Sequence, residues 1–183
     1  LIEEEPLIHD KKLERDYPQF SPDGKVVAFI EDRNRLMVVN LDTKKIRQVT
    51  DGSTWYTRSG GFDYSWSPDG KWFTLRFIGN KHDPYSDIGL VSADGKGQII
   101  NLTNSGYTSG SPRWVMGGNA ILFITERYGM RNHASWGSLN DVMIAFLNQD
   151  AYDKFRLSKE DYELQKELEK EQEKAAQKDD KAS

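Results

Sequence analysis

Short apolar runs alternate with turn-forming residues along the first 146 positions of the chain. The runs are rich in β-branched and aromatic residues, and Gly, Pro, Asp or Asn stands at their ends. This pattern is typical of β-strands joined by tight turns. The expected strands cover residues 26–30, 36–39, 46–50, 72–78, 87–91, 98–103, 120–125 and 141–146.

One turn motif repeats along the chain. Residues 20–25 read Phe-Ser-Pro-Asp-Gly-Lys, residues 66–71 read Trp-Ser-Pro-Asp-Gly-Lys, and residues 112–119 hold a degraded third copy. The aromatic residue of the motif stands at positions 20, 66 and 114, so the copies are 46 and 48 residues apart. Pro presets φ, Asp bonds to the local backbone and Gly tolerates a positive φ. We therefore expect a tight hairpin between the first and second strands of each copy.

A period of roughly 40–50 residues with four strands per unit is typical of propeller blades. A β-sandwich is the alternative. The expected fold class is all-β: a partial β-propeller of about three four-stranded blades, followed by a charged C-terminal helix or disordered tail. The expected domains are the end of a preceding blade (1–16), two blades (17–53 and 54–106), an incomplete blade (107–150) and a charged helical or disordered insertion (151–183).

The residues after about Ala151 follow a helical pattern. Ser158 precedes an acidic first turn and is a candidate N-cap. Beyond it, Tyr162, Leu164 and Leu168 are the large apolar residues, and charged residues dominate the rest. A charged linker is the favoured interpretation, because the apolar positions do not continue as a coiled-coil seam. A partner helix of a coiled coil is the alternative.

Composition excludes several classes of function. The chain of 183 residues has 25 Lys and Arg against 29 Asp and Glu, a net charge of −4, so nucleic acid is not an expected partner. It has no Cys, which removes disulfides, thiolate metal sites and a cysteine nucleophile. No apolar run is long enough to span a membrane. Because the chain begins with Leu1, we interpret it as an excerpt, and the compartment of its parent stays open.

The sequence offers no catalytic constellation. No Gly-x-Ser-x-Gly nucleophile elbow is present, and the three histidines, His9, His82 and His133, do not stand at metal-ligand spacing. Most carboxylates belong to turns or to the charged tail. We expect no catalytic residue, no metal and no cofactor in this chain.

The long loops are the expected binding region. In an up-and-down blade, the loops after the second and fourth strands open on the same side of the sheet, and here those are the long ones. Long loops on a rigid scaffold commonly carry binding sites, and aromatic and Arg residues are enriched in interfaces. The alternative is that these aromatics pack the loops against neighbouring blades. The candidates for the binding face are Trp55, Arg58, His82, Tyr85, Tyr107, Arg131, His133 and Trp136.

The repeats resemble the TolB-type propeller repeat, and longer stretches resemble the propeller region of tricorn-type serine proteases. These stretches are residues 6–10, 66–72, 101–107, 128–131 and 141–155. The last reads Asp-Val-Met-Ile-Ala-Phe-Leu-Asn-Gln-Asp-Ala-Tyr-Asp-Lys-Phe and is the most specific of them. The resemblance covers roughly residues 5–165.

The resemblance implies a non-catalytic propeller segment of a large peptidase that also has a PDZ-like module and a separate catalytic domain. It implies peptides and those other domains as partners, and it is compatible with a homo-oligomeric parent. The implied role is to shape peptide access or product release. The alternatives are a TolB-type interaction propeller without a protease and a propeller cap of a prolyl-oligopeptidase-type hydrolase. A cytoplasmic location follows the family, and a periplasmic one would follow from a signal peptide in the parent.

Overall fold

The computed structural model describes residues 4–10, 12–53, 55, 62–79, 85–129 and 138–182. The chain divides into two compact units, Leu1–Ala145 and Phe146–Ser183. The first unit holds the β-sheets, and the second holds the helices.

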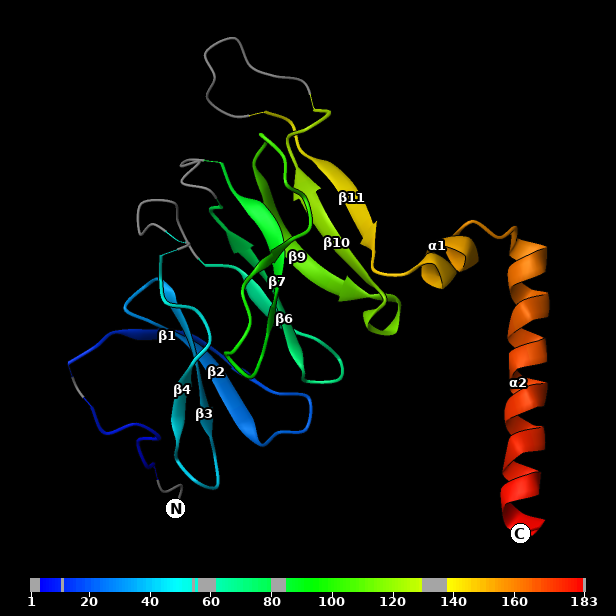
Figure 1. Cartoon of the computed structure of the whole chain (residues 1–183), viewed down its shortest axis with the longest axis horizontal. Coiled ribbons are helices and arrows are strands. Elements are labelled where there is room, and N and C mark those ends of the chain that lie inside the picture. Colours follow the sequence, from blue (N-terminus) through cyan, green and yellow to red (C-terminus); the bar gives the residue numbers. More distant parts are fainter. Residues whose placement is uncertain are drawn as a thin grey trace. The chain divides into compact units, whose positions relative to one another are not determined.

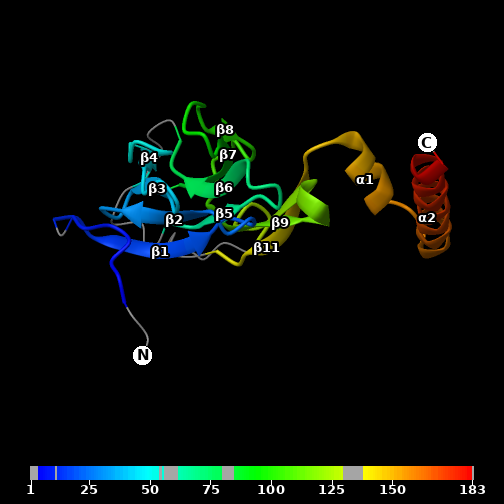
Figure 2. The ribbon, with the colours of Figure 1, turned by 90° about the horizontal axis from the view of Figure 1, so that it is seen from below.

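Three sheets follow one another along the chain (Figures 1 and 2). The first has the order β1-β2-β3-β4, the second β5-β6-β7-β8 and the third β11-β10-β9. Neighbouring strands in the first two sheets are antiparallel, as are β9 and β10. The bounds are β1 Arg15–Phe20, β2 Val26–Glu31, β3 Arg35–Asn40, β4 Ile46–Gln48, β5 Tyr64–Trp66, β6 Trp72–Phe77, β7 Asp87–Ser92, β8 Ile100–Asn101, β9 Ser109–Val115, β10 Ala120–Thr125 and β11 Asp141–Phe146. The predicted all-β, propeller-type fold is confirmed, with two complete blades and a third sheet of three strands.

The repeated turn motif forms the predicted hairpin. Between β1 and β2, the Ser21 hydroxyl donates to the Asp23 carboxylate at 2.6 Å and accepts from the Val26 N–H at 3.0 Å. Gly24 adopts a φ of 70°, which a residue with a Cβ rarely does. Between β5 and β6, the corresponding contacts of Ser67 measure 2.6 and 2.9 Å. The same serine and aspartate hydrogen bonds therefore close the first hairpin of both blades.

The degraded third copy of the motif closes its hairpin differently. A single 3-10 turn, η2 (Met116–Gly118), joins β9 to β10. Met116 and Gly117 both have a positive φ, and the Asn119 side chain donates to the Met116 carbonyl at 2.9 Å. This turn carries no carboxylate, so the third hairpin lacks the Ser–Asp contact that the first two share.

Successive blades are joined by a repeated contact of the motif's aromatic residue. The Trp66 indole donates to the carbonyl of Gln19 at 3.3 Å, and the Trp114 indole donates to the carbonyl of Ser65 at 3.1 Å. In each case the acceptor is the residue just before the equivalent aromatic position of the preceding blade. The period of the sequence thus sets the register between blades.

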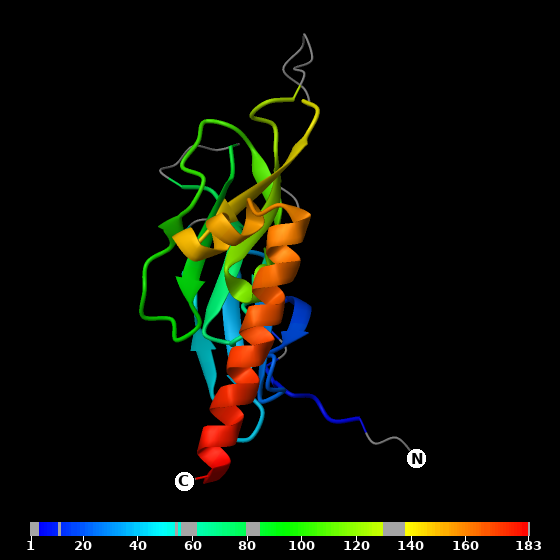
Figure 3. The same cartoon turned by 90° about the vertical axis from the view of Figure 1, so that its right-hand side faces the viewer.

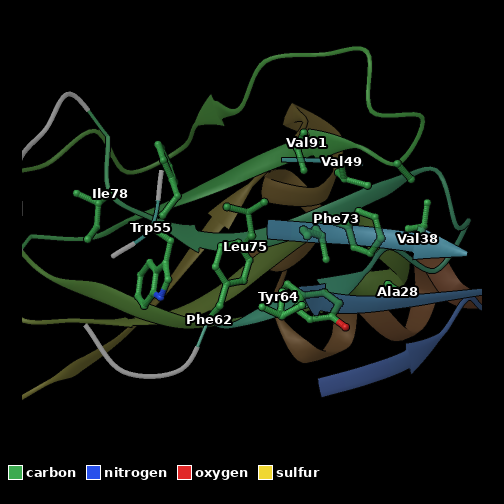
Figure 4. Close-up of a cluster of buried hydrophobic side chains, with 14 residues drawn as sticks. Ala28, Val38, Val49, Trp55, Phe62, Tyr64, Phe73, Leu75, Ile78 and Val91 are labelled. Atoms are coloured by element: carbon green, nitrogen blue, oxygen red, sulfur yellow. The ribbon is translucent and has the colours of Figure 1, made fainter. Parts of the chain in front are cut away.

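An aromatic-rich core lies between the first and second blades (Figure 4). Trp55, Phe62, Tyr64 and Phe73 form successive ring contacts with centroid distances of 5.6, 6.4 and 5.9 Å. The Tyr64 hydroxyl donates to the carbonyl of Tyr17. Burial raises the pKa of the Tyr64 phenol, so this group stays neutral. The buried members of this core are Ala28, Ile30, Leu36, Val38, Val49, Trp55, Phe62, Tyr64, Phe73, Leu75, Phe77, Ile78, Val91 and Ala93.

Two smaller cores flank the first. Ile88 of β7 packs against Ile121 and Phe123 of β10, which joins the second blade to the third sheet. On the other face of the first blade, Leu7 and Ile8 pack against a cluster of β2 and β3 residues. The described residues before β1 form no strand. That segment 1–16 ends a preceding blade therefore stays a prediction, as do the other domain bounds.

The fourth strands are shorter than the sequence pattern predicts. β4 ends at Gln48, although the predicted strand continues to residue 50. The Val49 N–H still donates to the Leu36 carbonyl at 2.8 Å, but the Leu36 N–H donates to the Thr50 hydroxyl at 3.0 Å. A side-chain oxygen thus replaces a backbone carbonyl, and the regular ladder ends there.

The second unit contains helices α1 (Gln149–Phe155) and α2 (Lys159–Ala182). α1 begins two residues earlier than predicted, because the Asn148 side chain accepts from the Ala151 N–H at 2.8 Å and caps the helix. Ser158 caps α2, accepting from the Asp161 N–H at 3.1 Å. Figure 3 shows α2 as one continuous helix. The charged segment is therefore helical as far as Ala182.

Candidate functional site

Three of the eight predicted face residues can be placed. Trp55, Tyr85 and Tyr107 belong to the described residues. The other five, Arg58, His82, Arg131, His133 and Trp136, lie outside the described residues. The binding face as a set stays a prediction.

Trp55 and Tyr85 have opposite environments. Trp55 is 1% exposed and packs edge-on against Phe62, so its ring belongs to the core. Tyr85, which lies two residues before β7 and directly before Ser86, is 48% exposed. Tyr107 is partly buried in the connection between β8 and β9. Tyr85 therefore offers the most aromatic surface of the three.

Arg76 is a functional candidate that the sequence analysis missed. Its guanidinium lies over the Trp55 ring, 5.0 Å from the ring centroid. Its Nε donates to the Ser86 hydroxyl at 2.8 Å, and that hydroxyl donates to the Ser109 carbonyl at 2.8 Å. The Ser109 N–H returns a bond to the Ser86 carbonyl at 2.8 Å. The cation is thus fixed where the second blade meets the third sheet, next to the residue that follows Tyr85.

The charge of Arg76 is partly desolvated. Burial lowers the pKa of the guanidinium, while the carboxylates of Asp63 and Glu126 act in the opposite direction. An arginine side chain remains protonated in proteins, so a positive charge persists at this junction. The signal in the sequence was a single cation within the apolar strand Trp72–Phe77. Because strand interiors are commonly apolar, an isolated Arg there points to a buried polar network.

The side of the short turns carries a groove of about 780 Å³. The pattern of loop lengths in the sequence predicts no role for this side. The groove lies between the Ser-Pro-Asp-Gly turns of the first two blades and the turn after β7. Its lining combines carboxylates, cations, prolines and indoles: Asp23, Asp69, Asp94, Arg47, Lys71, Pro22, Pro68, Trp66 and Trp72 are among its residues.

The groove's carboxylates are held ionised by their own turns. The hydroxyl of Ser21 and the N–H of Lys25 lower the pKa of Asp23, and Ser67 and Lys71 lower that of Asp69. A general acid at neutral pH needs a raised pKa. These aspartates therefore serve turn geometry, as the sequence analysis expected of them.

The part of the chain that the structure describes contains no group of three or more His, Cys, Asp or Glu residues that could hold a metal ion. Within the same residues, no helix has the length and apolar character needed to cross a membrane. His9 is exposed in the segment before β1.

Comparison with known proteins identifies the class of protein to which this fold corresponds. Over 76% of its length, the chain superposes on the crystal structure of the tricorn protease, with a TM-score of 0.56 and 14% identity. A protein from Agrobacterium tumefaciens that is provisionally identified as TolB gives a TM-score of 0.51 and 21% identity, also over 76% of this chain. A prolyl endopeptidase gives a TM-score of 0.53 and 17% identity over 75% of it. These structural similarities establish a propeller-type fold.

Sequence comparison leads to peptidases. The chain is 28% identical over 108 residues to a protein of Sulfurisphaera tokodaii provisionally named a tricorn-like protease C-terminal subunit. It is 27% identical over 116 residues to the uncharacterized peptidase YuxL of Bacillus subtilis. The matches cover 59% and 57% of this chain but 12% and 16% of those proteins. No protein-family model matches the chain. The predicted resemblance to tricorn-type proteases is confirmed in sequence and in fold.

Proposed function

We propose that the chain is a non-catalytic β-propeller segment of a larger tricorn-like peptidase, and that its long-loop side guides peptides to, or products from, a catalytic domain elsewhere in that protein. The supporting observation is the sequence similarity to two much longer proteins named as peptidases, which this chain matches over only 12% and 16% of their lengths. A segment of that size corresponds to part of a propeller and not to a complete peptidase.

The junction at Arg76 supports peptide guidance physically. A fixed guanidinium, hydrogen-bonded to the residue that follows the exposed Tyr85, offers hydrogen bonds to peptide carbonyls or a terminal carboxylate, and the tyrosine ring offers apolar contact. The hydrogen bonds from Arg76 to Ser86 and from Ser86 to Ser109 hold the guanidinium in place before any peptide binds. Preorganised polar groups of this kind lower the entropic cost of association.

A propeller cap of a prolyl-oligopeptidase-type hydrolase is the second candidate. The similarity to YuxL, which is named only as a peptidase, supports it as well. The two candidates share a non-catalytic propeller and differ in the catalytic domain attached to it. A TolB-type interaction propeller shares the fold alone.

The experiment compares the 183-residue chain with the full-length gene product. The isolated chain should show no turnover of fluorogenic peptides. In the full-length protein, Tyr85→Ala should raise KM about fivefold, the equivalent of ~1 kcal/mol of lost peptide binding. The kcat and the thermal unfolding midpoint should stay unchanged. Tyr85→Phe should retain most of the binding, since the ring remains.

The matched control is Asp42→Ala, which alters the exposed turn between β3 and β4. It should leave KM unchanged. Turnover that co-purifies with the isolated chain would contradict the non-catalytic assignment. Equal KM values for the Tyr85→Ala and control proteins would contradict peptide guidance by this surface.

A further inference from the structure

The two complete blades hold their fourth strands with the same pair of contacts. The second blade repeats the arrangement of the first, in which Val49 and Thr50 bond to Leu36. The Leu102 N–H donates to the Ile88 carbonyl at 2.8 Å, and the Ile88 N–H donates to the Thr103 hydroxyl at 3.1 Å. An aliphatic residue followed by Thr thus binds the second residue of the third strand in both blades.

In the second blade, a carboxylate strengthens this attachment. Asp87, the first residue of β7, is 7% exposed. Its carboxylate accepts from the Thr103 hydroxyl at 2.5 Å, from the Asn101 side chain at 2.9 Å and from the Ser105 N–H at 3.1 Å. Hydrogen bonds to an ionised acceptor are the strong ones. Asp87 therefore binds the fourth strand and the residues that follow it.

Asp141 occupies the same position in the third sheet. β7 and β11 are both six-residue strands that begin with Asp, followed by an aliphatic residue. The Oδ2 atom of Asp141 is buried, and the structure gives it no hydrogen-bond partner among the described residues. A buried acceptor without a partner is costly, and native structures rarely retain one. β11 is also an edge strand, and the described residues after it are helical from Gln149.

We propose that the β11 edge receives a fourth strand from the same polypeptide, and that Asp141 binds it as Asp87 binds β8. The strand would run antiparallel to β11 and would carry an aliphatic residue and Thr opposite Val142. The Thr hydroxyl and an Asn amide would donate to Asp141. In the second blade, Gly89 faces Asn101. By the same register, the Asn of the incoming strand would face Met143.

The order of the complete blades supports a source in the same polypeptide. In both of them the fourth strand follows the third along the chain. α1 and α2 then form an insertion between the third and fourth strands of the last blade, which leaves the order of the strands unchanged. An unpaired edge strand that is left open invites pairing between separate molecules. A strand from the same chain removes that hazard at every protein concentration.

The test uses a synthetic peptide copy of residues 97–106, which holds β8 and its Asn-Leu-Thr segment, as a surrogate strand for the full 183-residue chain. Labelled peptide should bind saturably in fluorescence anisotropy, and a scrambled peptide should not. Asp141→Ala in the chain should weaken binding tenfold or more, while the control Asp42→Ala should leave it unchanged. Thr103→Val in the peptide should weaken binding to the original chain and have no further effect on the Asp141→Ala chain.

The source of the strand is tested separately. The full-length gene product, with its own strand in place, should not bind the peptide. Equal peptide affinity for the original and Asp141→Ala chains, no saturable binding, or strong binding by the full-length protein would each overturn the proposal. Dimerisation of the chain that Asp141→Ala abolishes would also overturn it, because the occupant would then be a second copy. None of these measurements involves peptide turnover, so they are independent of the proposed function.

Discussion

The second blade and the third sheet have the same strand pattern but different surroundings. Ile88 of β7 is fully buried because it packs on the third sheet, whereas Val142, at the same position of β11, is 69% exposed. Asp87 has three hydrogen-bond donors, while an oxygen of Asp141 is buried without one among the described residues. The comparison shows that one strand sequence becomes core or surface according to the neighbour that covers it.

The first blade shows the same effect at the other end of the sheets. Trp66 and Trp114 each donate to the preceding blade, but Phe20, at the equivalent position of the first blade, is 67% exposed. The aromatic residue of the repeat thus contacts the preceding blade. Where the described residues contain no preceding blade, as at Phe20, the ring is exposed to solvent. Each blade therefore repeats the same sequence pattern, but its stability depends on contacts with the neighbouring blades.

The largest expected difference concerns the aliphatic pair. Ile88→Ala should lower the free energy of unfolding by about 3 kcal/mol, because it leaves a cavity between two sheets. Val142→Ala should cost less than about 1 kcal/mol, since its side chain is mostly in water. Urea unfolding followed by Trp fluorescence measures both, and all five Trp residues precede the helices. Equal losses would show that β11 is covered in solution.

A smaller difference is expected for the carboxylate pair. Asp87→Ala should lower the free energy of unfolding by about 2 kcal/mol, because a buried charged acceptor and its donors are separated. Asp141→Ala in the 183-residue chain should leave it unchanged or raise it by up to ~1 kcal/mol, since an unpaired buried oxygen is removed. The same urea titrations provide the values. A loss of stability for Asp141→Ala that matches that of Asp87→Ala would contradict the comparison.

The smallest expected difference concerns acid sensitivity of the turns. The Ser67 hydroxyl and the Lys71 N–H lower the pKa of Asp69 in the folded state. The contribution of Asp69 to the free energy of unfolding is therefore fully present above the unfolded-state pKa of about 3.9. It is lost as the pH falls from that value through the lower pKa of the folded state. The η2 turn of the third sheet has no such group. Asp69→Asn should lose less stability than the original chain between pH 5 and about pH 3, with Asp42→Asn as the control.

A wider fall in stability for the Asp69→Asn protein than for the original chain would contradict this pH prediction. The unfolding midpoint in urea, measured at both pH values for each protein, decides it. The comparison cancels the contribution of the other carboxylates, because all proteins share them.

Much of the fold was predictable because its signals are local. The Ser-Pro-Asp-Gly turns and the Ser158 cap depend on hydrogen bonds within a few residues. The early end of β4 was not predictable, since it depends on Thr50 reaching the backbone of Leu36, fourteen positions away in the sequence. For the candidate site, the chain pattern pointed to the long loops but gave no indication of Arg76 or of the groove between the turns.

The sequence by itself determined the order of the strands within a repeat and the chemistry of their turns, since period and turn residues act over short distances along the chain. Only the tertiary structure decided which of the repeated residues are buried. Trp55 became core and Tyr85 surface, and Asp87 was satisfied while an Asp141 oxygen was not. The physical reason is that burial and pairing of these groups depend on a neighbouring blade or strand, which lies tens of residues away in the sequence.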